Sequence, residues 1–286
     1  MTETTAPWAD RSFLRDVQYR TDANLAARQS IYSYQQPHID LQARVLDLAA
    51  PAAGETVCDV GCGNGMYLAE LARRGFAGRV LGLDLSPGML AAARERLTSA
   101  DPATSMESAS APGAQATASS ASKVELLAAD ATALPLRDGT ADLTLALHML
   151  YHVPDPSLAI RELRRVTRPG GRVVIVLNGP DHLQELRAIV AQVRGEEIWG
   201  QQERLRLDGG EVLARLHFST VTRHDFVSEL RLPDPQPIAD YVRSMSGTQH
   251  SADPERLVAA AVSSFPATPG APFTITTHVG CLICEV

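Results

Sequence analysis

Between residues 55 and 194, short apolar runs alternate with segments in which apolar residues recur three or four positions apart. The first pattern predicts buried strands and the second predicts amphipathic helices. The expected strands are 55–59, 79–83, 124–128, 142–147 and 172–177, and the expected helices are 66–74, 157–167 and 181–194. Strands and helices that alternate through short turns are typical of parallel βαβ units, with helices on both faces of the sheet.

Turn residues support several of these boundaries. Gly75 fits the C-cap of the first helix, and Ser86 and Pro87 begin another helix as its N-cap and first-turn residue. The Pro-Gly-Gly turn at 169–171 is expected to end the helix at 157–167. The predicted fold class is therefore α/β, with a doubly wound, mostly parallel sheet.

The segments on either side of this core have weaker patterns. Residues 10–50 show uneven helical spacing, broken by Pro37, and predict an N-terminal helical lid over residues 1–50. Beyond residue 194 we expect helices at 210–216, 237–245 and 254–262, and strands at 219–227 and 273–285. The chain then divides into the lid, a core at 51–227, and a helical cap with a final strand at 228–286.

One stretch inside the core lacks any such pattern. Residues 98–122 are rich in Ala, Ser, Thr and Pro and contain almost no large apolar side chain. Such a segment cannot bury enough surface to become ordered, so we expect a disordered surface insertion. Because long surface loops cost little free energy, it should not disturb the fold around it.

The composition of the chain narrows the range of possible partners and cellular locations. The 286 residues are enough for a single large core, and 45% of them are hydrophobic, as in ordinary globular proteins. The formal net charge of -7 and the absence of a Lys/Arg run argue against a nucleic-acid partner. We also expect no membrane span, no secretory signal and a cytoplasmic location, in which the four cysteines stay reduced.

The clearest chemical signal is a glycine turn that follows the first core strand. The strand ends in Asp59, and Gly61 and Gly63 permit backbone angles and close ligand approach that a Cβ would forbid. The next strand ends on Asp84, where an acidic side chain typically accepts ribose hydroxyls. A dinucleotide or S-adenosylmethionine fits this layout, but the dinucleotide fingerprint requires a third glycine where this chain has Met66.

Four motifs in order along the chain resemble those of class I S-adenosylmethionine-dependent methyltransferases. VCDVGCGNG looks like the family's first motif and LGLDLSPGML like its second. LLAADATALPLRDGTADLTLALHMLYHVPD resembles the third and fourth, and LRRVTRPGGRVVIV resembles the helix and strand that close the core. The similarity covers about Thr56 to Asn178 and implies a Rossmann-like, seven-stranded sheet with a final antiparallel strand.

The resemblance also implies roles for individual residues. Tyr19 and Arg28 would belong to a lid that meets the cofactor, and His148 would lie near the reacting methyl group. The remaining implied cofactor contacts run from the methionine end to the adenine end: Asp59, Gly61, Gly63, Asp84, Leu85, Met89, Asp130 and Ala131.

Methyl transfer is an in-line displacement at a carbon that a sulfonium already activates, so the enzyme mainly aligns the acceptor and excludes water. A general base is needed only when the acceptor must lose a proton. His148 and His152 are the candidates, because they follow the carboxyl end of a strand. The alternative is that they only hydrogen-bond a loop.

Residues for the acceptor are harder to choose. Asn178 ends a strand and should face the crevice, and Tyr241 could line an acceptor pocket or belong to the core. His278, Cys281 and Cys284 have the spacing H-x₂-C-x₂-C, but ligands three apart on a strand alternate faces. We therefore expect no metal.

The sequence thus predicts a methyltransferase that uses S-adenosylmethionine on a small molecule, with natural-product biosynthesis as a candidate context. The alternatives are a nicotinamide-dependent oxidoreductase and a non-catalytic S-adenosylmethionine-binding protein. The nucleophilic atom (oxygen, nitrogen or carbon) and the question of a homodimer stay open.

Overall fold

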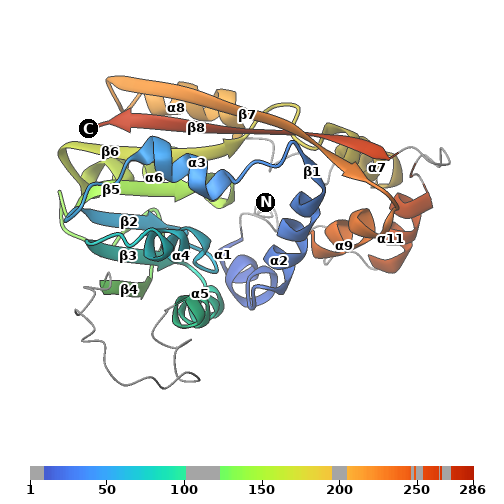
Figure 1. Ribbon diagram of the computed structural model, residues 1–286, viewed down its shortest axis with the longest axis horizontal. Helices are drawn as coiled ribbons and strands as arrows, with labels where there is room; N and C mark the ends of the chain where they lie inside the picture. Colours follow the sequence, from blue (N-terminus) through green and yellow to red (C-terminus); the bar gives the residue numbers. More distant parts are fainter. Residues whose placement is uncertain are drawn as a thin grey trace, which may run out of the picture.

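The computed structural model describes residues 10–100, 123–194, 205–245, 248, 254–263, 265 and 272–286. Their strands form one sheet with the order β1-β7-β8-β6-β5-β2-β3-β4, and helices cover both of its faces (Figure 1). The α/β fold class predicted from the sequence is confirmed. No helix in these ranges is long and apolar enough to cross a membrane.

Five parallel strands form the half of the sheet that carries the motifs. β2 lies between β3 and β5, so the strand order reverses at β2 and successive strands are added on opposite sides of it. Ligands bind at such a switch point, at the carboxyl ends of the strands. The parallel strands are β2 (Thr56–Val60), β3 (Arg79–Asp84), β4 (Lys123–Ala128), β5 (Ala141–Leu147) and β6 (Thr167–Asn178).

The other half of the sheet is antiparallel. β8 (Phe273–Glu285) lies between β6 and β7 (Thr220–Leu232) and runs against both, as the family resemblance implies for the final strand. The expected count of seven strands is wrong, because the two-residue β1 (Gln35–Gln36) pairs with Leu230 and Glu229 at the edge. Nothing in an isolated Gln-Gln pair distinguishes it from a loop.

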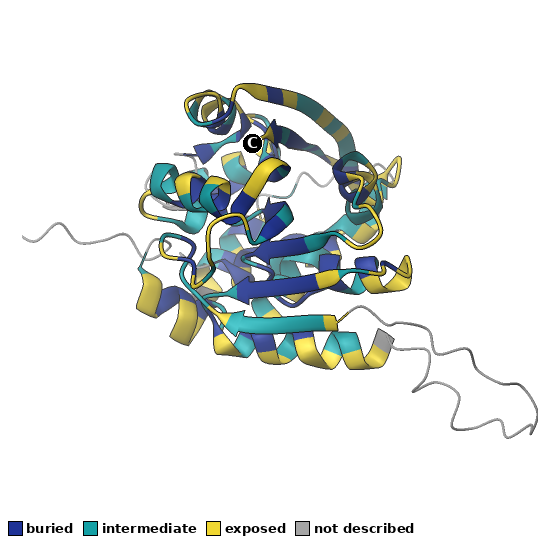
Figure 2. Cartoon of the chain, turned by 90° about the vertical axis from the view of Figure 1, so that its left-hand side faces the viewer, coloured by how far each residue is buried: buried dark blue, intermediate teal, exposed yellow. Residues whose placement is uncertain are grey.

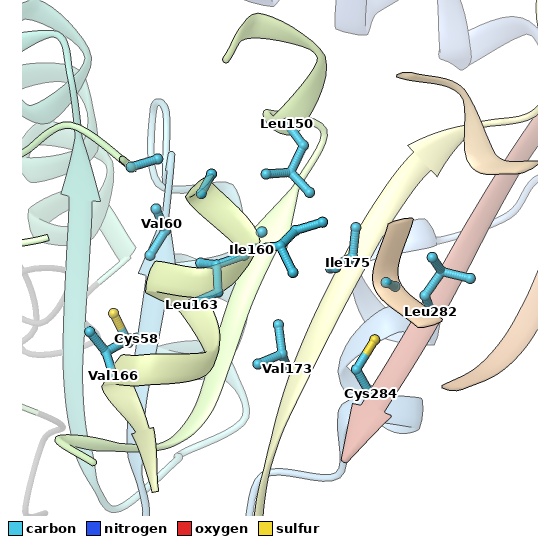
Figure 3. Packing of buried hydrophobic residues seen from close by; sticks show 14 of the residues in the cluster. Cys58, Val60, Leu150, Ile160, Leu163, Val166, Val173, Ile175, Leu282 and Cys284 are labelled. Carbon is cyan, nitrogen blue, oxygen red and sulfur yellow. The ribbon is translucent and has the colours of Figure 1, made fainter. Parts of the chain in front are cut away.

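Buried side chains alternate between the two faces of the sheet. One face is covered by α3 (Leu41–Ala49), α4 (Met66–Arg73) and α5 (Pro87–Ala100). The opposite face is covered by α6 (Pro156–Val166) and α8 (Leu207–Arg215). Figure 3 shows this second cluster, in which Ile160 and Leu163 of α6 point toward the strands. Figure 2 shows that the central strands are buried almost throughout, which explains their continuous apolar runs.

A third cluster joins the two ends of the chain. It contains Ile31, Leu230, Ile238, Val258 and Ile275, all with at most 4% of their surface exposed. Besides β7 and β8 it involves the helices η3 (Ile31–Tyr34), α7 (Gln184–Arg194), α9 (Gln236–Ser244) and α11 (Pro254–Ser263). The N-terminal α2 (Ala23–Ser30) packs beside α9, as Figure 1 shows.

Two sequence-based boundaries are wrong by a few residues. The helix α5 extends to Ala100, so Thr98 and Ser99 are helical and their hydroxyls donate to the carbonyl of Glu95. The remainder of the expected insertion, 101–122, lies outside the described residues. Strand β6 begins at Thr167 and includes the Pro-Gly-Gly sequence, with a register shift opposite Ala141 and Leu143.

Candidate cofactor site

A cavity lies at the carboxyl ends of β2, β3 and β5, beneath the N-terminal segment. It brings together most of the residues expected from the sequence, whereas Arg28, Asn178 and Tyr241 do not line it. The expected residues that do line it are Tyr19, Asp59, Gly61, Gly63, Asp84, Leu85, Met89, Asp130, Ala131, His148 and His152.

The glycine turn is held by the neighbouring strand. The N–H groups of Gly61 and Cys62 both donate to the carbonyl of Leu83, at 2.7 and 3.0 Å. Gly61 has a φ of 73°, in the left-handed region that favours glycine. A Cβ at Gly61 would lie 2.7 Å from the Cβ of Met149, so the turn also depends on the absence of a side chain.

Asp84 fastens this turn to the next strand. Its carboxylate accepts the N–H of Gly63 at 2.9 Å and the N–H of Ser86 at 2.8 Å. Burial raises the pKa of Asp84, and the backbone N–H donors act in the opposite direction. The carboxylate therefore positions the loop and still faces the cavity.

Asp59 is the most unusual acid of the cavity. It is 1% exposed, and its Oδ1 has no hydrogen-bond partner among the described residues. Burial and the nearby Asp84 raise the pKa of Asp59 to about 7. Asn64 and Tyr67 also line the cavity and have unpartnered buried atoms, Nδ2 and Oη. Because buried polar atoms are nearly always hydrogen-bonded, these three atoms point to a polar ligand, and the Asp59 carboxylate favours one that carries a donor or a positive charge.

The N-terminal segment closes over the cavity from α1 (Arg11–Phe13) and η2 (Leu14–Gln18). The hydroxyl of Ser86 donates to the carbonyl of Tyr19 at 2.7 Å. A Cβ at Gly88 would lie 2.0 Å from the carbonyl oxygen of Arg20, so the start of α5 and the lid meet backbone to backbone.

Asp130, expected at the adenine end, already has an ion pair and hydrogen bonds within the protein. Its Oδ2 lies 2.8 Å from Nε of Arg11, and its Oδ1 accepts from the backbone and hydroxyl of Thr132. The family motif locates Asp130, but nothing in the sequence pattern indicates that Arg11, 119 residues earlier, would lie against it.

His148 is held in an uncommon conformation at the end of β5. Its φ is 57°, and its N–H donates to the carbonyl of Val176 at 3.0 Å. Burial lowers the pKa of His148 to about 4, against the opposing effect of a hydrogen bond with the Asn178 side chain. The imidazole is therefore neutral near pH 7, and Asn178 positions it without lining the cavity itself.

His152 belongs to a chain of side chains that runs out of the cavity. Its Nε2 lies 2.9 Å from Oη of Tyr19, which accepts a hydrogen bond from Nη2 of Arg28 at 3.0 Å. The Arg28 guanidinium also lies 5.5 Å from the centre of the Tyr19 ring. Tyr19 thus connects the two residues, and Arg28 lies behind it.

Cys281, Cys284 and His278 lie in different surroundings and are not grouped around one point. Cys281 and Cys284 belong to the clusters on opposite faces of the sheet, and all four cysteines are buried as free thiols. His278 lies between the carboxylates of Asp181 and Asp225, the latter at 2.7 Å. Within the described ranges no three His, Cys, Asp or Glu side chains are grouped as metal ligands.

Sequence reasoning missed several residues that line the cavity. Asn64 lies inside the glycine motif and could have been included with it. Arg11, Tyr67, Ser86 and Tyr151 come from helices and turns whose pattern does not mark them as functional.

Comparisons with known proteins find methyltransferases. Residues 58–175 match the model of the Methyltransferase domain family. The chain is 28% identical to a malonyl-[acyl-carrier protein] O-methyltransferase of Serratia marcescens over 73% of this chain and 69% of that protein. It is 36% identical to a demethylmenaquinone methyltransferase of Clavibacter sepedonicus over 44% of this chain, but spans only 42% of that relative.

A solved structure has the same fold. Phosphoethanolamine N-methyltransferase 2 of Haemonchus contortus, determined with phosphomonomethylethanolamine and S-adenosylhomocysteine, superposes with a TM-score of 0.57. The match covers 98% of this chain and 60% of that one, at 18% identity. Residues 58–175 thus form a methyltransferase domain, and the motifs and fold of the chain are similar to those of class I S-adenosylmethionine-dependent methyltransferases.

Proposed function

We propose that the chain transfers a methyl group from S-adenosylmethionine to a small-molecule acceptor. The observation that carries this proposal is Asp59, a buried acid with an unpartnered oxygen at the end of β2. S-adenosylmethionine has both a sulfonium and an ammonium group, so a carboxylate and neutral polar groups suit it. Bound there, the cofactor would supply a methyl group that the sulfonium has already activated.

The residues of the cavity fit this cofactor. Gly61 and Gly63 keep the turn free of side chains, and a Cβ at Gly63 would lie 3.5 Å from Leu25 and 3.6 Å from Met89, within the cavity wall. We propose that Asp84, whose carboxylate accepts the N–H of Gly63, also accepts hydrogen bonds from the ribose hydroxyls. We therefore propose the cofactor contacts expected from the sequence for the residues that line the cavity, which Arg28 and Tyr241 do not.

The chain's own contribution to the reaction is alignment, exclusion of water and handling of a proton. The lid residues Tyr19 and Arg11 cover the cavity. His148 is unprotonated near pH 7, and its pKa of about 4 makes it a weak base. We propose it for orienting the acceptor, and His152 for holding a proton that the acceptor must lose.

A small-molecule acceptor is supported by the acidic composition and by the names of the relatives, a malonyl-[acyl-carrier protein] O-methyltransferase and a demethylmenaquinone methyltransferase. Natural-product biosynthesis, a cytoplasmic location and the absence of nucleic-acid or membrane partners stay predictions. So do the division at residues 50 and 227 and a homodimer.

Turnover tests the proposal directly. Purified chain is incubated with S-adenosylmethionine labelled in its methyl group, together with a panel of carboxylic acids, phenols and quinols, or with transfer RNA or duplex DNA. We expect label in at least one small molecule and none in nucleic acid. Label in nucleic acid would overturn the acceptor assignment. Tight cofactor binding without any transfer would favour the non-catalytic alternative.

A second expectation concerns the pH dependence of cofactor binding. With a pKa of about 7, Asp59 is about half ionised at pH 7 and about one-tenth ionised at pH 6 in the free protein. If its charged form binds the cation, lowering the pH from 7 to 6 weakens S-adenosylmethionine binding about fivefold, since binding must release a proton. The cofactor's ammonium stays protonated over this range.

Calorimetry at the two pH values measures this effect, and Asp59→Asn is the matched variant. It keeps the size of the side chain but cannot ionise, so its affinity should be lower and independent of pH in this window. A fivefold loss that persists in Asp59→Asn would assign the titration to another group.

A further inference from the structure

Arg28 is a partly buried cation without a carboxylate partner in the described part of the chain. It lies on α2, and its two hydrogen bonds go to neutral oxygens: Tyr19 Oη at 3.0 Å and the backbone carbonyl of Ser244 at 3.1 Å. These bonds use two of the five N–H donors of a guanidinium. Most other described arginines with a printed partner are paired with Asp or Glu, as Arg172 is with Glu55.

The carbonyl oxygen of Ser244, which faces Arg28, carries only a partial negative charge and accepts a second hydrogen bond. Ser244 is the last residue of α9, so its carbonyl belongs to the negative end of the helix dipole. The same carbonyl also accepts Nε2 of the buried Gln18 at 3.2 Å. A helix end that serves two donors compensates only part of a full positive charge. Part of the positive charge of Arg28 is therefore uncompensated and could attract an anion.

Tyrosines from three other segments surround the guanidinium. The hydroxyls of Tyr19, Tyr151 and Tyr241 are close enough to interact electrostatically with Arg28. Tyr32 also belongs to this group, and its hydroxyl lies 3.0 Å from Nε2 of His182.

Two of these hydroxyls lack partners. In the described ranges, no hydrogen bond involves Oη of Tyr151 or Tyr241, although both side chains are partly buried and burial raises the pKa of each. A hydroxyl in such a place normally bonds water or a ligand. Together with the unused donors of Arg28, they leave several donors near the guanidinium that a ligand could use.

This region is next to the reaction site. Tyr19 connects Arg28 to His152 through hydrogen bonds of 3.0 and 2.9 Å. Tyr19, Tyr151 and His152 line the cofactor cavity, whereas Arg28 and Tyr241 lie beyond it. A molecule anchored at Arg28 would extend past Tyr19 and Tyr151 toward His148 and His152. That is where a methyl acceptor has to lie.

We propose that Arg28 anchors the methyl acceptor, and that the acceptor is a small carboxylic acid whose single carboxylate pairs with Arg28 and accepts from Tyr151 and Tyr241. One cation among neutral tyrosines compensates one negative charge, so a dianion such as a phosphate would leave a charge uncompensated in a partly buried site. The tyrosine rings favour an apolar, planar body. The inference rests on the proposed methyl-transfer function and replaces the cofactor role expected for Arg28.

The test compares acids with their neutral amides. The protein is saturated with S-adenosylhomocysteine, and the affinities of benzoate and benzamide, cinnamate and cinnamamide, and 3,4-dihydroxybenzoate and its amide are measured by ligand-observed NMR. We expect at least one acid to bind more than about tenfold more tightly than its amide, as a charge-assisted contact predicts. Arg28→Gln should abolish that preference, while S-adenosylhomocysteine affinity stays within about threefold of the wild type.

Further variants distinguish the loss of the Arg28 charge from a general loss of folding. Arg28→Lys keeps the charge and should retain part of the preference for acids. Tyr241→Phe should lower the affinity for the acid about fivefold and leave that for the amide nearly unchanged. Arg94→Gln, which changes an exposed arginine of α5 outside the cavity, is the matched control and should behave as the wild type. Circular dichroism confirms that each variant is folded.

The outcomes are distinguishable. If S-adenosylhomocysteine binds but no acid is preferred over its amide, or if the preference survives in Arg28→Gln, the acceptor proposal is wrong and the methyltransferase proposal stands. If Arg28→Gln loses S-adenosylhomocysteine binding instead, Arg28 serves the cofactor. If the wild type does not bind S-adenosylhomocysteine, both proposals fail.

Discussion

Replacing Asp84 by alanine is expected to weaken S-adenosylmethionine binding by about 100-fold or more. The carboxylate accepts the N–H groups of Gly63 and Ser86, which fix the glycine turn against β3. It is also the proposed acceptor for the ribose hydroxyls. Hydrogen bonds to a charged group contribute about 1.5–3 kcal/mol each, and 1.4 kcal/mol corresponds to tenfold in affinity, so losing two such bonds accounts for this effect.

Calorimetry with matched variants checks this result. Asp84→Asn keeps an oxygen that can accept the N–H of Gly63, so its affinity should fall between that of the wild type and that of Asp84→Ala. Asp47→Ala removes an exposed carboxylate that pairs with Arg74 away from the cavity, and should bind the cofactor normally. An affinity of Asp84→Ala within threefold of the wild type would show that the cofactor does not use this acid.

Replacing Gly61 by alanine is the second change with a large expected effect. A φ of 73° costs a residue with a Cβ about 1–2 kcal/mol. In addition, the new Cβ would lie 2.7 Å from Cβ and 2.8 Å from Cγ of Met149. A Cβ cannot rotate away, so the turn or the segment that follows β5 must move. We expect cofactor affinity to fall more than about tenfold and the melting temperature to fall as well.

Gly54→Ala separates backbone strain from steric overlap. Gly54 has a φ of 85°, but a Cβ built there meets no atom within 4 Å. This variant should lose a similar amount of stability from strain and retain wild-type cofactor affinity. Equal cofactor affinity in Gly54→Ala and Gly61→Ala would refute the steric account of the turn. Thermal unfolding and calorimetry on the same preparations give both quantities.

The parts of the fold that follow from local pattern could be predicted. Strand β8 was expected at 273–285 and is observed there, because its apolar and β-branched residues have the composition of a buried strand although the surrounding pattern is weak. The glycine turn and Asp84 could also be assigned from local pattern. A left-handed turn between a buried strand and a helix requires glycine locally, whatever the rest of the chain does.

The features that could not be predicted depend on contacts between distant segments. Arg11 meets Asp130, and Arg28 meets Ser244, across more than 100 residues. Asn178 was expected to face the crevice, but the tertiary packing turns it toward His148. The pairing of β1 with β7 likewise joins segments that are distant in the sequence, and two glutamines carry no strand pattern of their own.

The most direct test of the central claim is a titration of the wild-type chain with S-adenosylmethionine and, separately, with NAD by calorimetry. The account predicts micromolar binding of S-adenosylmethionine, a free energy near -8 kcal/mol, and no measurable binding of NAD. Binding of NAD without binding of S-adenosylmethionine would contradict it. The glycine turn would then have to be assigned to a dinucleotide despite Met66 in the third glycine position.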